Sequence, residues 1–274
     1  TVPHKSEVAK LCDHLSEPAS TAGAVNTLSF QDGEIHGDNT DGIGLLRDLA
    51  INQGITLEGA NILILGAGGA TRGIVGPLLE MQPSSLRIAN RTIDKAQALA
   101  EHFSHSGPVS ACRFNMVPIT EDYDLIINAT SAGVRGETPP YPEAALSERT
   151  FCYDLSYGLK PTPFSVWARE HGAARSVMGW GMLVEQAAES FRIWRGVRPD
   201  TGPVLKQMTI TAYGLSSQFC SHRRPGIASR GACFCIGRGV LVNPAGHSLN
   251  NNPFVEMCAL SVTRADRVQS NART

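Results

Sequence analysis

The chain has 274 residues, of which 42% are apolar and 18% charged, and its formal net charge is -1. That content is ample for one large or two medium globular domains, whereas the near-neutral charge excludes the basic surface that nucleic acid or anionic membranes require. No apolar run approaches the roughly 18 residues of a membrane-spanning helix. We therefore expect a cytoplasmic protein with a small-molecule substrate, and three scattered cysteines in residues 1–208 fit reduced thiols.

The first sixty residues predict a helix, a hairpin and a second helix. Apolar residues follow helical spacing over residues 6–15, and Pro18 ends that pattern. Two extended runs, residues 24–30 and 34–39, flank an Asp-Gly pair, which predicts a β-hairpin. Another helix is expected over residues 43–53.

From residue 61 onwards, apolar strands alternate with amphipathic helices. The expected strands are residues 61–65, 85–89, 124–129 and 151–155, and the expected helices are residues 70–81, 92–103, 162–172 and 182–194. Strands that alternate with helices form a parallel, doubly wound sheet. The predicted fold class is therefore α/β, with a Rossmann-like sheet.

A glycine-rich loop follows the first of these strands, in the segment ILILGAGGATRG. The strand ends at Gly66, and Gly68, Gly69 and Ala70 open the next helix, where free N–H groups and the helix dipole can hold a pyrophosphate. Thr71 occupies the third glycine position of the usual spacing. A tight strand-to-helix turn without a ligand remains the alternative at this point.

The end of the next strand indicates which dinucleotide would bind. An NAD-binding protein usually has an acid here, but this chain has Asn90, Arg91 and Thr92, with Lys95 one turn later. Cations at a helix N-terminus are unfavourable without an anionic partner. The pattern favours the 2'-phosphate of NADP. Further along, Thr130 follows a strand and is expected near the nicotinamide end, with an ordinary turn as the alternative.

Hydride transfer to a ketone also needs an acid that protonates the oxygen. Lys5 can serve if a carboxylate orients it, and Asp41 in the segment GDNTDG is the best partner. Asp, Asn and Gly also favour turns, so this segment can equally be plain loop chemistry. Spacing alone does not bring Lys5 and Asp41 together.

The first 208 residues contain, in this order, TVPHK, AGAVNT, GDNTDG, GAGGATRG, NRT, INATSAG, YDLSY and GWGMLVEQA. This succession resembles the shikimate dehydrogenase family. The resemblance implies reversible reduction of 3-dehydroshikimate with NADPH, in a cleft between a substrate domain and a Rossmann-like domain. It assigns residues 1–40 to a substrate domain, 41–181 to an NADP-binding domain and 182–208 to helices that return to the substrate domain.

The resemblance also implies a role for each candidate residue. Lys5 and Asp41 match the catalytic pair. Substrate-binding positions are Thr1, Asn26, Tyr157 and Gln186. Cofactor-binding positions are Gly66, Gly68, Gly69, Ala70, Asn90, Arg91, Thr92, Lys95, Thr130, Gly179 and Met182. Lys95 stands where relatives often have arginine, which preserves the charge but loses the planar fork.

The chain departs from the family at both ends. It lacks an opening stretch with a Ser-x-Ser pair, so we expect an incomplete α/β substrate domain that folds poorly and has little or no activity. Residues 209–274 hold seven arginines and two acidic residues, which gives this tail a net charge of +5. The whole chain has 24 basic and 25 acidic residues, so residues 1–208 have a net charge of -6. We expect the tail to be disordered and unrelated to the family, with a frame disruption as its preferred origin.

Several alternatives stay open at this stage. The chain can be a quinate/shikimate dehydrogenase paralogue, or a non-catalytic NADP-binding remnant. A glutamyl-tRNA reductase shares a similar glycine loop, but TVPHK and GDNTDG have no place in that enzyme. Cys233 and Cys235 lack a second well-spaced pair, so no metal site is expected. We expect no nucleic-acid or membrane partner, and either a monomer or a homodimer.

Overall fold

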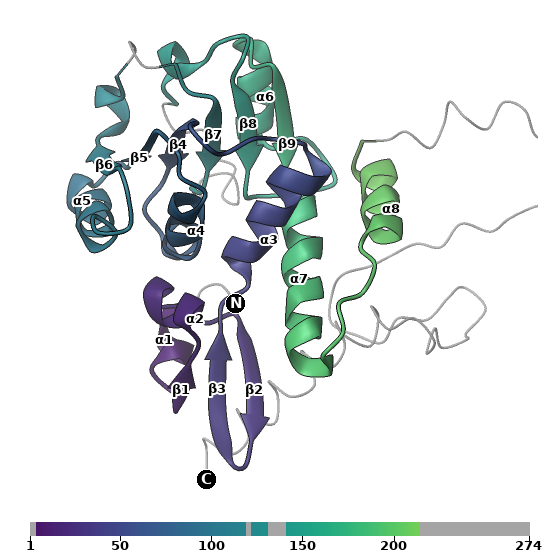
Figure 1. Cartoon of the computed structure of the whole chain (residues 1–274). Coiled ribbons are helices and arrows are strands. Elements are labelled where there is room, and N and C mark those ends of the chain that lie inside the picture. Colours follow the sequence, from purple (N-terminus) through teal and green to yellow (C-terminus); the bar gives the residue numbers. More distant parts are fainter. Residues whose placement is uncertain (1–3, 119–121, 131–140, 214–274) are drawn as a thin grey trace, which may run out of the picture. The chain divides into compact units, whose positions relative to one another are not determined.

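The computed structural model describes residues 4–118, 122–130 and 141–213, with side chains described as far as Met208. Two sheets organise this part of the chain (Figure 1). One has three strands in the order β1-β3-β2, and the other has six in the order β6-β5-β4-β7-β8-β9. Within the described ranges, no helix has the length and apolar character needed to cross a membrane.

The six-stranded sheet is parallel throughout, which confirms the predicted doubly wound α/β fold. Strand order reverses direction between β4 and β7, and ligands bind beyond the carboxyl ends of strands at such a point. The strands are β4 (Asn61–Leu65), β5 (Ser85–Ala89), β6 (Val109–Cys112), β7 (Leu125–Asn128), β8 (Phe151–Asp154) and β9 (Arg175–Met178).

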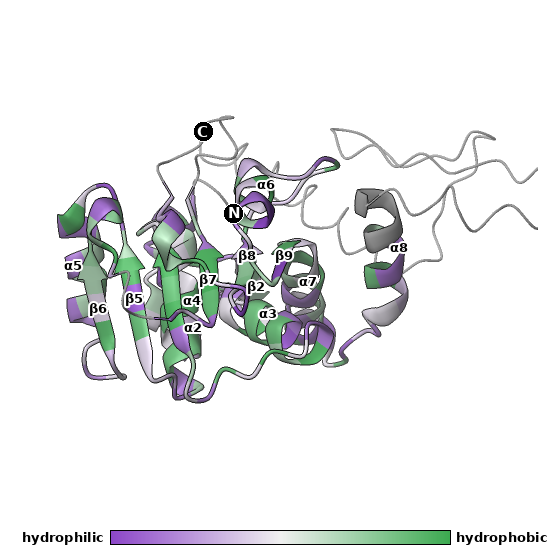
Figure 2. Cartoon of the chain, turned by 90° about the horizontal axis from the view of Figure 1, so that it is seen from above, coloured by the Kyte–Doolittle hydropathy of each residue, from purple (hydrophilic) through white to green (hydrophobic). Residues whose placement is uncertain are grey.

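Helices cover both faces of this sheet, so its central strands are buried on both sides. Successive β4 side chains enter different cores: Ile62 and Ile64 lie in the core beneath α4 (Gly69–Glu80) and α5 (Ile93–His102). Leu63 and Leu65 lie in the other core, with α6 (Pro163–Glu170). Figure 2 shows hydrophobic residues along central strands such as β7. Burial on two faces explains the unbroken apolar runs of these strands.

The N-terminal segment differs from the helix predicted over residues 6–15. It contains α1 (Lys5–Ala9), β1 (His14–Leu15) and α2 (Glu17–Ala22). The Ala19 amide donates to Ser16 Oγ at 3.3 Å, so Ser16 caps α2 and Pro18 lies in its first turn. Proline at a first turn loses no helical hydrogen bond. Pro18 therefore helps to start a helix, and the prediction that it only ends one was wrong.

The predicted hairpin is present. Strands β2 (Thr27–Gln31) and β3 (Glu34–Asp38) pair antiparallel, and Asp32 and Gly33 adopt positive φ angles of 52° and 87° in the turn. Asp and Gly tolerate that conformation better than other residues. β1 adds to the other edge of β3 as a parallel strand.

Two helices, α3 (Asp41–Arg47) and α7 (Trp180–Arg195), pack together between the two sheets (Figure 1). α3 continues into the π-helical turn η1 (Asp48–Asn52) and packs along α7. A short 3-10 turn lies at Phe114–Met116 (η2) and another at Glu143–Ala145 (η4). α8 (Gly202–Tyr213) continues past the expected boundary at residue 209, and the rest of the predicted tail lies outside the described residues.

Candidate active site

Lys5 and Asp41 form an ion pair in the structure. Lys5 begins α1 and Asp41 begins α3, and Lys5 Nζ donates to Asp41 Oδ2. The two side chains are only 14% and 6% exposed. The Asp41 amide donates to Asn39 Oδ1 at 3.0 Å. The tertiary fold thus joins two residues that sequence spacing left apart.

The GDNTDG loop that carries Asp41 is held at several points. Asp38 Oδ1 accepts from Ser16 Oγ at 2.8 Å and from the Asn39 amide at 2.7 Å. Asn39 Nδ2 donates to the Ala24 carbonyl at 2.9 Å and is buried. These bonds fix the start of α3, so the carboxylate of Asp41 is preorganised rather than free to rotate with a mobile turn.

Asn26 links this pair to α7. Its Nδ2 lies 2.9 Å from Asp41 Oδ1, 3.1 Å from Thr40 Oγ1 and 3.2 Å from Gln186 Oε1. An amide nitrogen has only two protons, so these three acceptors compete for them. Thr40 Oγ1 also donates to Gln186 Oε1 at 3.4 Å, so these polar groups satisfy one another in this structure. Sequence reasoning missed Thr40, and also Ser190, whose Oγ lies 3.2 Å from Thr40 Oγ1.

The remaining candidates for substrate binding are Tyr157 and Thr1. The Tyr157 ring packs against Trp180 at the start of α7, with ring centroids 4.6 Å apart. Partial burial raises the pKa of the Tyr157 phenol. Trp180 Nε1 is buried and finds no hydrogen-bond partner within the described part of the chain. Thr1 lies outside the described residues.

The glycine loop has the geometry of a phosphate cradle. Gly66 has a φ of +110°, and a Cβ there would lie 2.9 Å from the Ala129 carbonyl oxygen, so only glycine fits. A Cβ at Gly68 or Gly69 would meet open space, so their backbone is accessible in front of α4. Thr71 fits the third glycine position because its buried Oγ1 donates to the Gly66 carbonyl at 2.8 Å.

A cationic hollow lies beside this loop, beyond the ends of β5 and β6. Its volume is about 330 Å³, and Arg91, Arg113, Phe114 and Asn115 line it. Asn90 Nδ2 donates to the Thr92 carbonyl at 2.8 Å, which shapes the turn that carries Arg91. Thr92 occupies the N-cap position of α5 without a side-chain capping bond, and Lys95 is exposed within that helix. Ala70 is the second residue of α4. Sequence reasoning missed Arg113 because it missed β6, the strand that ends just before it.

The residues expected near the nicotinamide end lie beyond β7 and β8. Thr130 Oγ1 donates to Asn128 Oδ1 at 2.7 Å. A Cβ on Gly179 would lie 2.7 Å from the Leu155 carbonyl oxygen, which allows the start of α7 to approach β8 closely. The Met182 amide donates to the Tyr153 hydroxyl at 3.2 Å, and the Met182 side chain is buried.

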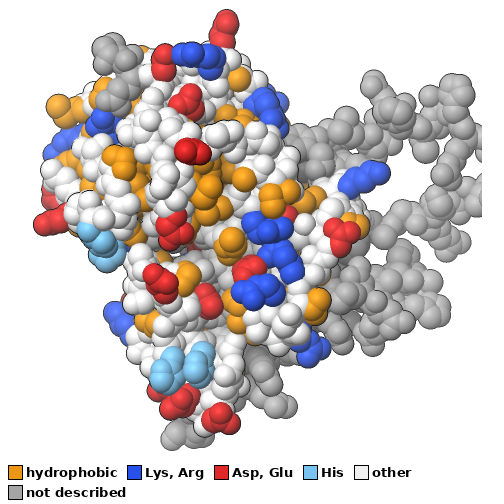
Figure 3. All heavy atoms as spheres, viewed as in Figure 1, with side chains coloured by type: hydrophobic (Ala, Val, Ile, Leu, Met, Phe, Trp, Pro, Cys, Tyr) orange, Lys and Arg blue, Asp and Glu red, His pale blue; other side chains and the backbone are white. Residues whose placement is uncertain are grey.

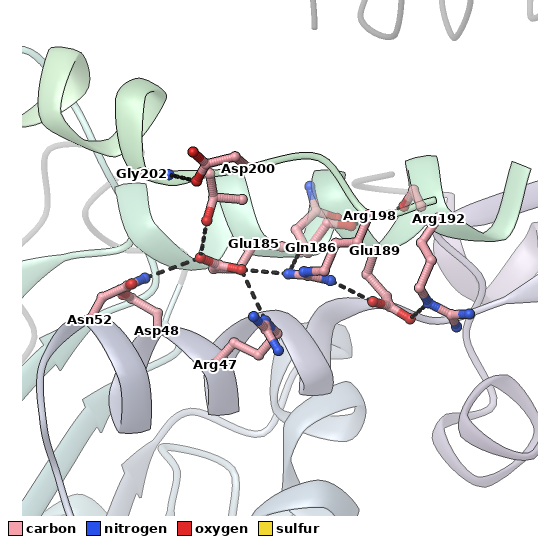
Figure 4. Close-up of polar contacts among 12 residues, drawn as sticks. Arg47, Asp48, Asn52, Glu185, Gln186, Glu189, Arg192, Arg198, Asp200 and Gly202 are labelled. Atoms are coloured by element: carbon pink, nitrogen blue, oxygen red, sulfur yellow. Dashed lines mark hydrogen bonds and ion pairs between the residues drawn. The ribbon is translucent and has the colours of Figure 1, made fainter. Parts of the chain in front are cut away.

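Beside Gln186, α7 carries a charged network that ties it to three other segments (Figure 4). Glu185 is 1% exposed and accepts from Arg47 Nε at 3.2 Å and from Arg198 Nη2. Asn52 and Thr201 also donate to it, at 3.3 Å and 2.8 Å. Burial raises the pKa of Glu185, but the bonds from Thr201, Asn52, Arg198 and Arg47 outweigh burial and lower it overall. The network fixes the helix that presents Gln186.

Family comparisons match most of residues 1–209. Residues 1–28 match the shikimate dehydrogenase substrate binding domain, residues 48–145 the shikimate / quinate 5-dehydrogenase family, and residues 179–209 the shikimate 5'-dehydrogenase C-terminal domain. A curated relative from Alkalilimnicola ehrlichii, named shikimate dehydrogenase (NADP(+)), is 52% identical over 205 residues, which are 75% of each chain. The chain belongs to the shikimate dehydrogenase family. A relative of that name from Vibrio cholerae is 50% identical over 209 residues, 76% of this chain and 74% of its own.

Solved structures agree with this membership of the shikimate dehydrogenase family. The Ael1 enzyme from Pseudomonas putida is 47% identical with a TM-score of 0.71, and 76% of each chain is covered. The Thermus thermophilus shikimate 5-dehydrogenase in complex with NADP(H) and shikimate is 32% identical with a TM-score of 0.65, over 78% of this chain and 77% of its own. A 5-ketofructose reductase from Gluconobacter is 30% identical with a TM-score of 0.66, so the same fold also serves another substrate; 78% and 77% of the two chains are covered.

Proposed function

We propose that the chain is an NADP-dependent shikimate dehydrogenase, an oxidoreductase that reduces 3-dehydroshikimate to shikimate and catalyses the reverse oxidation. This reaction belongs to the shikimate pathway of aromatic amino-acid and chorismate biosynthesis. The observation that carries the proposal is the Lys5–Asp41 ion pair, which Asn26 joins to Gln186. Family membership supplies the substrate, because curated relatives at about half identity carry this name.

Lys5 handles the proton in this mechanism. During reduction, Lys5 Nζ gives a proton to the ketone oxygen of the substrate, which becomes the hydroxyl oxygen of shikimate. During oxidation, Lys5 takes that proton back. Asp41 accepts a hydrogen bond from the same ammonium group and keeps it in place, while Asn26 and the Asn39 loop hold Asp41.

The substrate hydroxyls would bind the polar groups around this pair. Asn26 and Gln186 offer both donors and acceptors, which the substrate hydroxyls would engage in exchange for the present contacts with Thr40 and Asp41. Tyr157 would close the site from the loop after β8, where Trp180 supports its ring. Thr1 is assigned to the substrate by resemblance only.

The residues of the glycine loop and the adjacent hollow fit NADP. Open space over Gly68 and Gly69 leaves the α4 amides free for the pyrophosphate. Two guanidinium groups, Arg91 and Arg113, face one hollow, where a 2'-phosphate would neutralise them. Lys95 would add a third positive charge near the 2'-phosphate. When bound, NADPH supplies the hydride, with Thr130, Gly179 and Met182 near its nicotinamide.

The test measures NADPH formation from NADP and shikimate by the chain with a Ser-x-Ser opening stretch restored ahead of Thr1, and compares Lys5→Ala with Lys10→Ala in that protein. Lys10 lies one position beyond α1, and its side chain forms an ion pair with exposed Glu7, so it is a matched control outside the candidate site. We expect Lys5→Ala to lower kcat by about 10²- to 10⁴-fold, the usual contribution of an acid–base group, and Lys10→Ala to leave kcat unchanged. Full turnover by Lys5→Ala would contradict the proton-transfer role.

Two further measurements separate the alternatives. Quinate in place of shikimate distinguishes the quinate/shikimate paralogue, because that enzyme would oxidise both compounds at comparable rates. Fluorescence titration with NADPH identifies a non-catalytic remnant, which would bind the cofactor without any Lys5-dependent turnover. Preferential oxidation of shikimate with NADP is the result we expect. Sedimentation would decide between the monomer and homodimer, which remains a prediction.

A further inference from the structure

The three-stranded sheet carries a second cluster of chemically active side chains, which the proposed dehydrogenase activity does not use. His14, Glu34 and His36 each offer one ligand atom, and these atoms lie within 4.8 Å of one another. His14 Nε2 is 2.9 Å from Glu34 Oε2, and the two imidazole rings stack with centroids 4.7 Å apart. Figure 3 shows histidine and acidic side chains gathered over the part of the molecule formed by β1 and β3.

The backbone places these residues together independently of side-chain rotamers. His14 on β1 and His36 on β3 are register partners in a parallel pair, so their side chains stand on the same face of the sheet. Glu34 lies two residues before His36 on β3, and side chains two apart in a strand share a face. Three ligand-type residues therefore project from one small patch of sheet.

The strands beneath this patch are well fixed. The Asp13 amide donates to the Ile35 carbonyl at 2.9 Å, and the Ile35 amide donates to Asp13 Oδ2 at 2.8 Å. The Ser16 amide donates to the Gly37 carbonyl at 2.9 Å. A metal ion would thus meet ligands whose backbone is already ordered, which reduces the entropy cost of binding.

We propose that His14, His36 and Glu34 form a binding site for a divalent transition-metal ion of the zinc type. Two atoms bonded to one zinc ion at about 2.1 Å stand roughly 3.4 Å apart in tetrahedral geometry. The present separations, of up to 4.8 Å, would have to shorten, and the stacked rings would have to turn so that a nitrogen of each points at one ion. Two imidazoles and a carboxylate are ligands that zinc accepts, and they leave a fourth position for water.

The predicted consequence is a clamp between β1 and β3. β1 has only two residues, and a metal ion bonded to His14 and His36 would tie it to the neighbouring strand. A ligand that binds the folded state alone stabilises it by RT ln(1 + c/Kd) at free ligand concentration c, so the melting temperature rises once the zinc concentration exceeds Kd. Zinc should therefore stabilise this sheet without entering the Lys5–Asp41 site.

The experiment titrates the 274-residue chain, without a histidine tag, with zinc in competition with a chromophoric chelator. Glu34→Gln preserves shape and strand structure, and His14→Gln and His36→Gln each remove one imidazole. His105→Asn is the matched control, because His105 is exposed and lies outside the cluster. The tail cysteines give a background that is the same in all variants.

We expect the wild type and His105→Asn to bind one more zinc ion than His14→Gln or His36→Gln. Glu34→Gln should weaken that site by at least roughly tenfold, the minimum cost when even an outer-shell partner of a metal ligand is removed. Zinc should raise the melting temperature of the wild type and not that of the histidine variants. Equal zinc stoichiometry and affinity in the wild type and both histidine variants would overturn the proposal.

Discussion

Glu185 provides the most demanding test of how α7 is held. It lies in the buried network of Figure 4, next to Gln186, and the replacement Glu185→Gln keeps its shape while removing its charge. Removing one member of a buried ion pair costs about 3–5 kcal/mol, because its partners stay behind without compensation. Arg47 is 35% exposed and can regain water, while Arg198 is 19% exposed but keeps its ion pair with Glu189.

The expected loss is therefore at the lower end, about 3 kcal/mol of unfolding free energy. For a domain of this size, that corresponds to a drop of roughly 9 °C in melting temperature. Urea unfolding followed by circular dichroism measures the difference. Glu7→Gln is the control, since the Glu7–Lys10 pair is about 70% exposed and should contribute less than about 1 kcal/mol.

The pH dependence gives a second check on the same residue. The pKa of Glu185 is lowered in the folded chain from its ordinary value of 4.5. A depressed carboxyl pKa means that the stabilisation is fully present above the unfolded value and is lost as pH falls through the folded value. The gap between wild type and Glu185→Gln should therefore narrow as the pH falls below the ordinary value and through the lowered folded value. A Glu185→Gln loss no larger than that of Glu7→Gln at neutral pH would refute the reasoning.

Two other predictions concern the cofactor. Arg91→Ala and Arg113→Ala should each raise KM for NADPH by at least about tenfold, because each removes one charge-assisted pair, and should leave KM for NADH unchanged in the same steady-state assay. Equal effects on both cofactors would contradict the assignment of these arginines to the 2'-phosphate. Gly66→Ala should weaken NADPH binding and lower the free energy of unfolding by about 1–3 kcal/mol, because the φ angle of Gly66 is +110° and the new Cβ would meet the Ala129 carbonyl. An unchanged NADPH fluorescence titration and an unchanged urea unfolding curve would contradict this prediction.

The sheet could be predicted where its strands are fully buried. β4, β5, β7 and β8 appear as apolar runs because both of their faces pack under helices. β6 and β9 were missed because they lie at the two edges, where fewer positions are buried and the apolar pattern is weak. The start of the chain was misread because Pro18 can stop one helix or start another, and only the Ser16 cap decides between them.

The candidate site likewise contains residues that could be predicted from local sequence and residues that could not. The Gly66 loop and the Arg91 turn are local, so their residue types alone indicated a phosphate-binding role. The contact between Lys5 and Asp41 spans the hairpin. Residue types offered Asp41 as a partner for Lys5, but spacing could not bring the two together, so the resemblance to a family was needed to favour the pair before the fold was known. Arg113 and the Glu185 network depend on which elements become neighbours, and no short motif records that information.

The approach of α3 to α7 gives a last prediction that joins fold and site. Gly44 lies against Gln186: a Cβ at Gly44 would stand 2.6 Å from Gln186 Cβ and 2.8 Å from its backbone nitrogen. Backbone atoms cannot rotate away, so Gly44→Ala must push the two helices apart. Overpacking of this kind costs about 1–3 kcal/mol.

The same displacement moves Gln186 away from Asn26, whose Nδ2 lies 3.2 Å from Gln186 Oε1. Gly44→Ala should therefore raise KM for shikimate more than it raises KM for NADP, because the atoms nearest the new Cβ all belong to Gln186 and none to the glycine loop. Gly202→Ala is the control, since it lies outside the candidate site and the atom nearest its new Cβ would be the side-chain oxygen Oδ1 of Asp200, at 3.3 Å. Equal changes in both KM values, or none, would show that Gln186 does not depend on this contact for its position at the substrate.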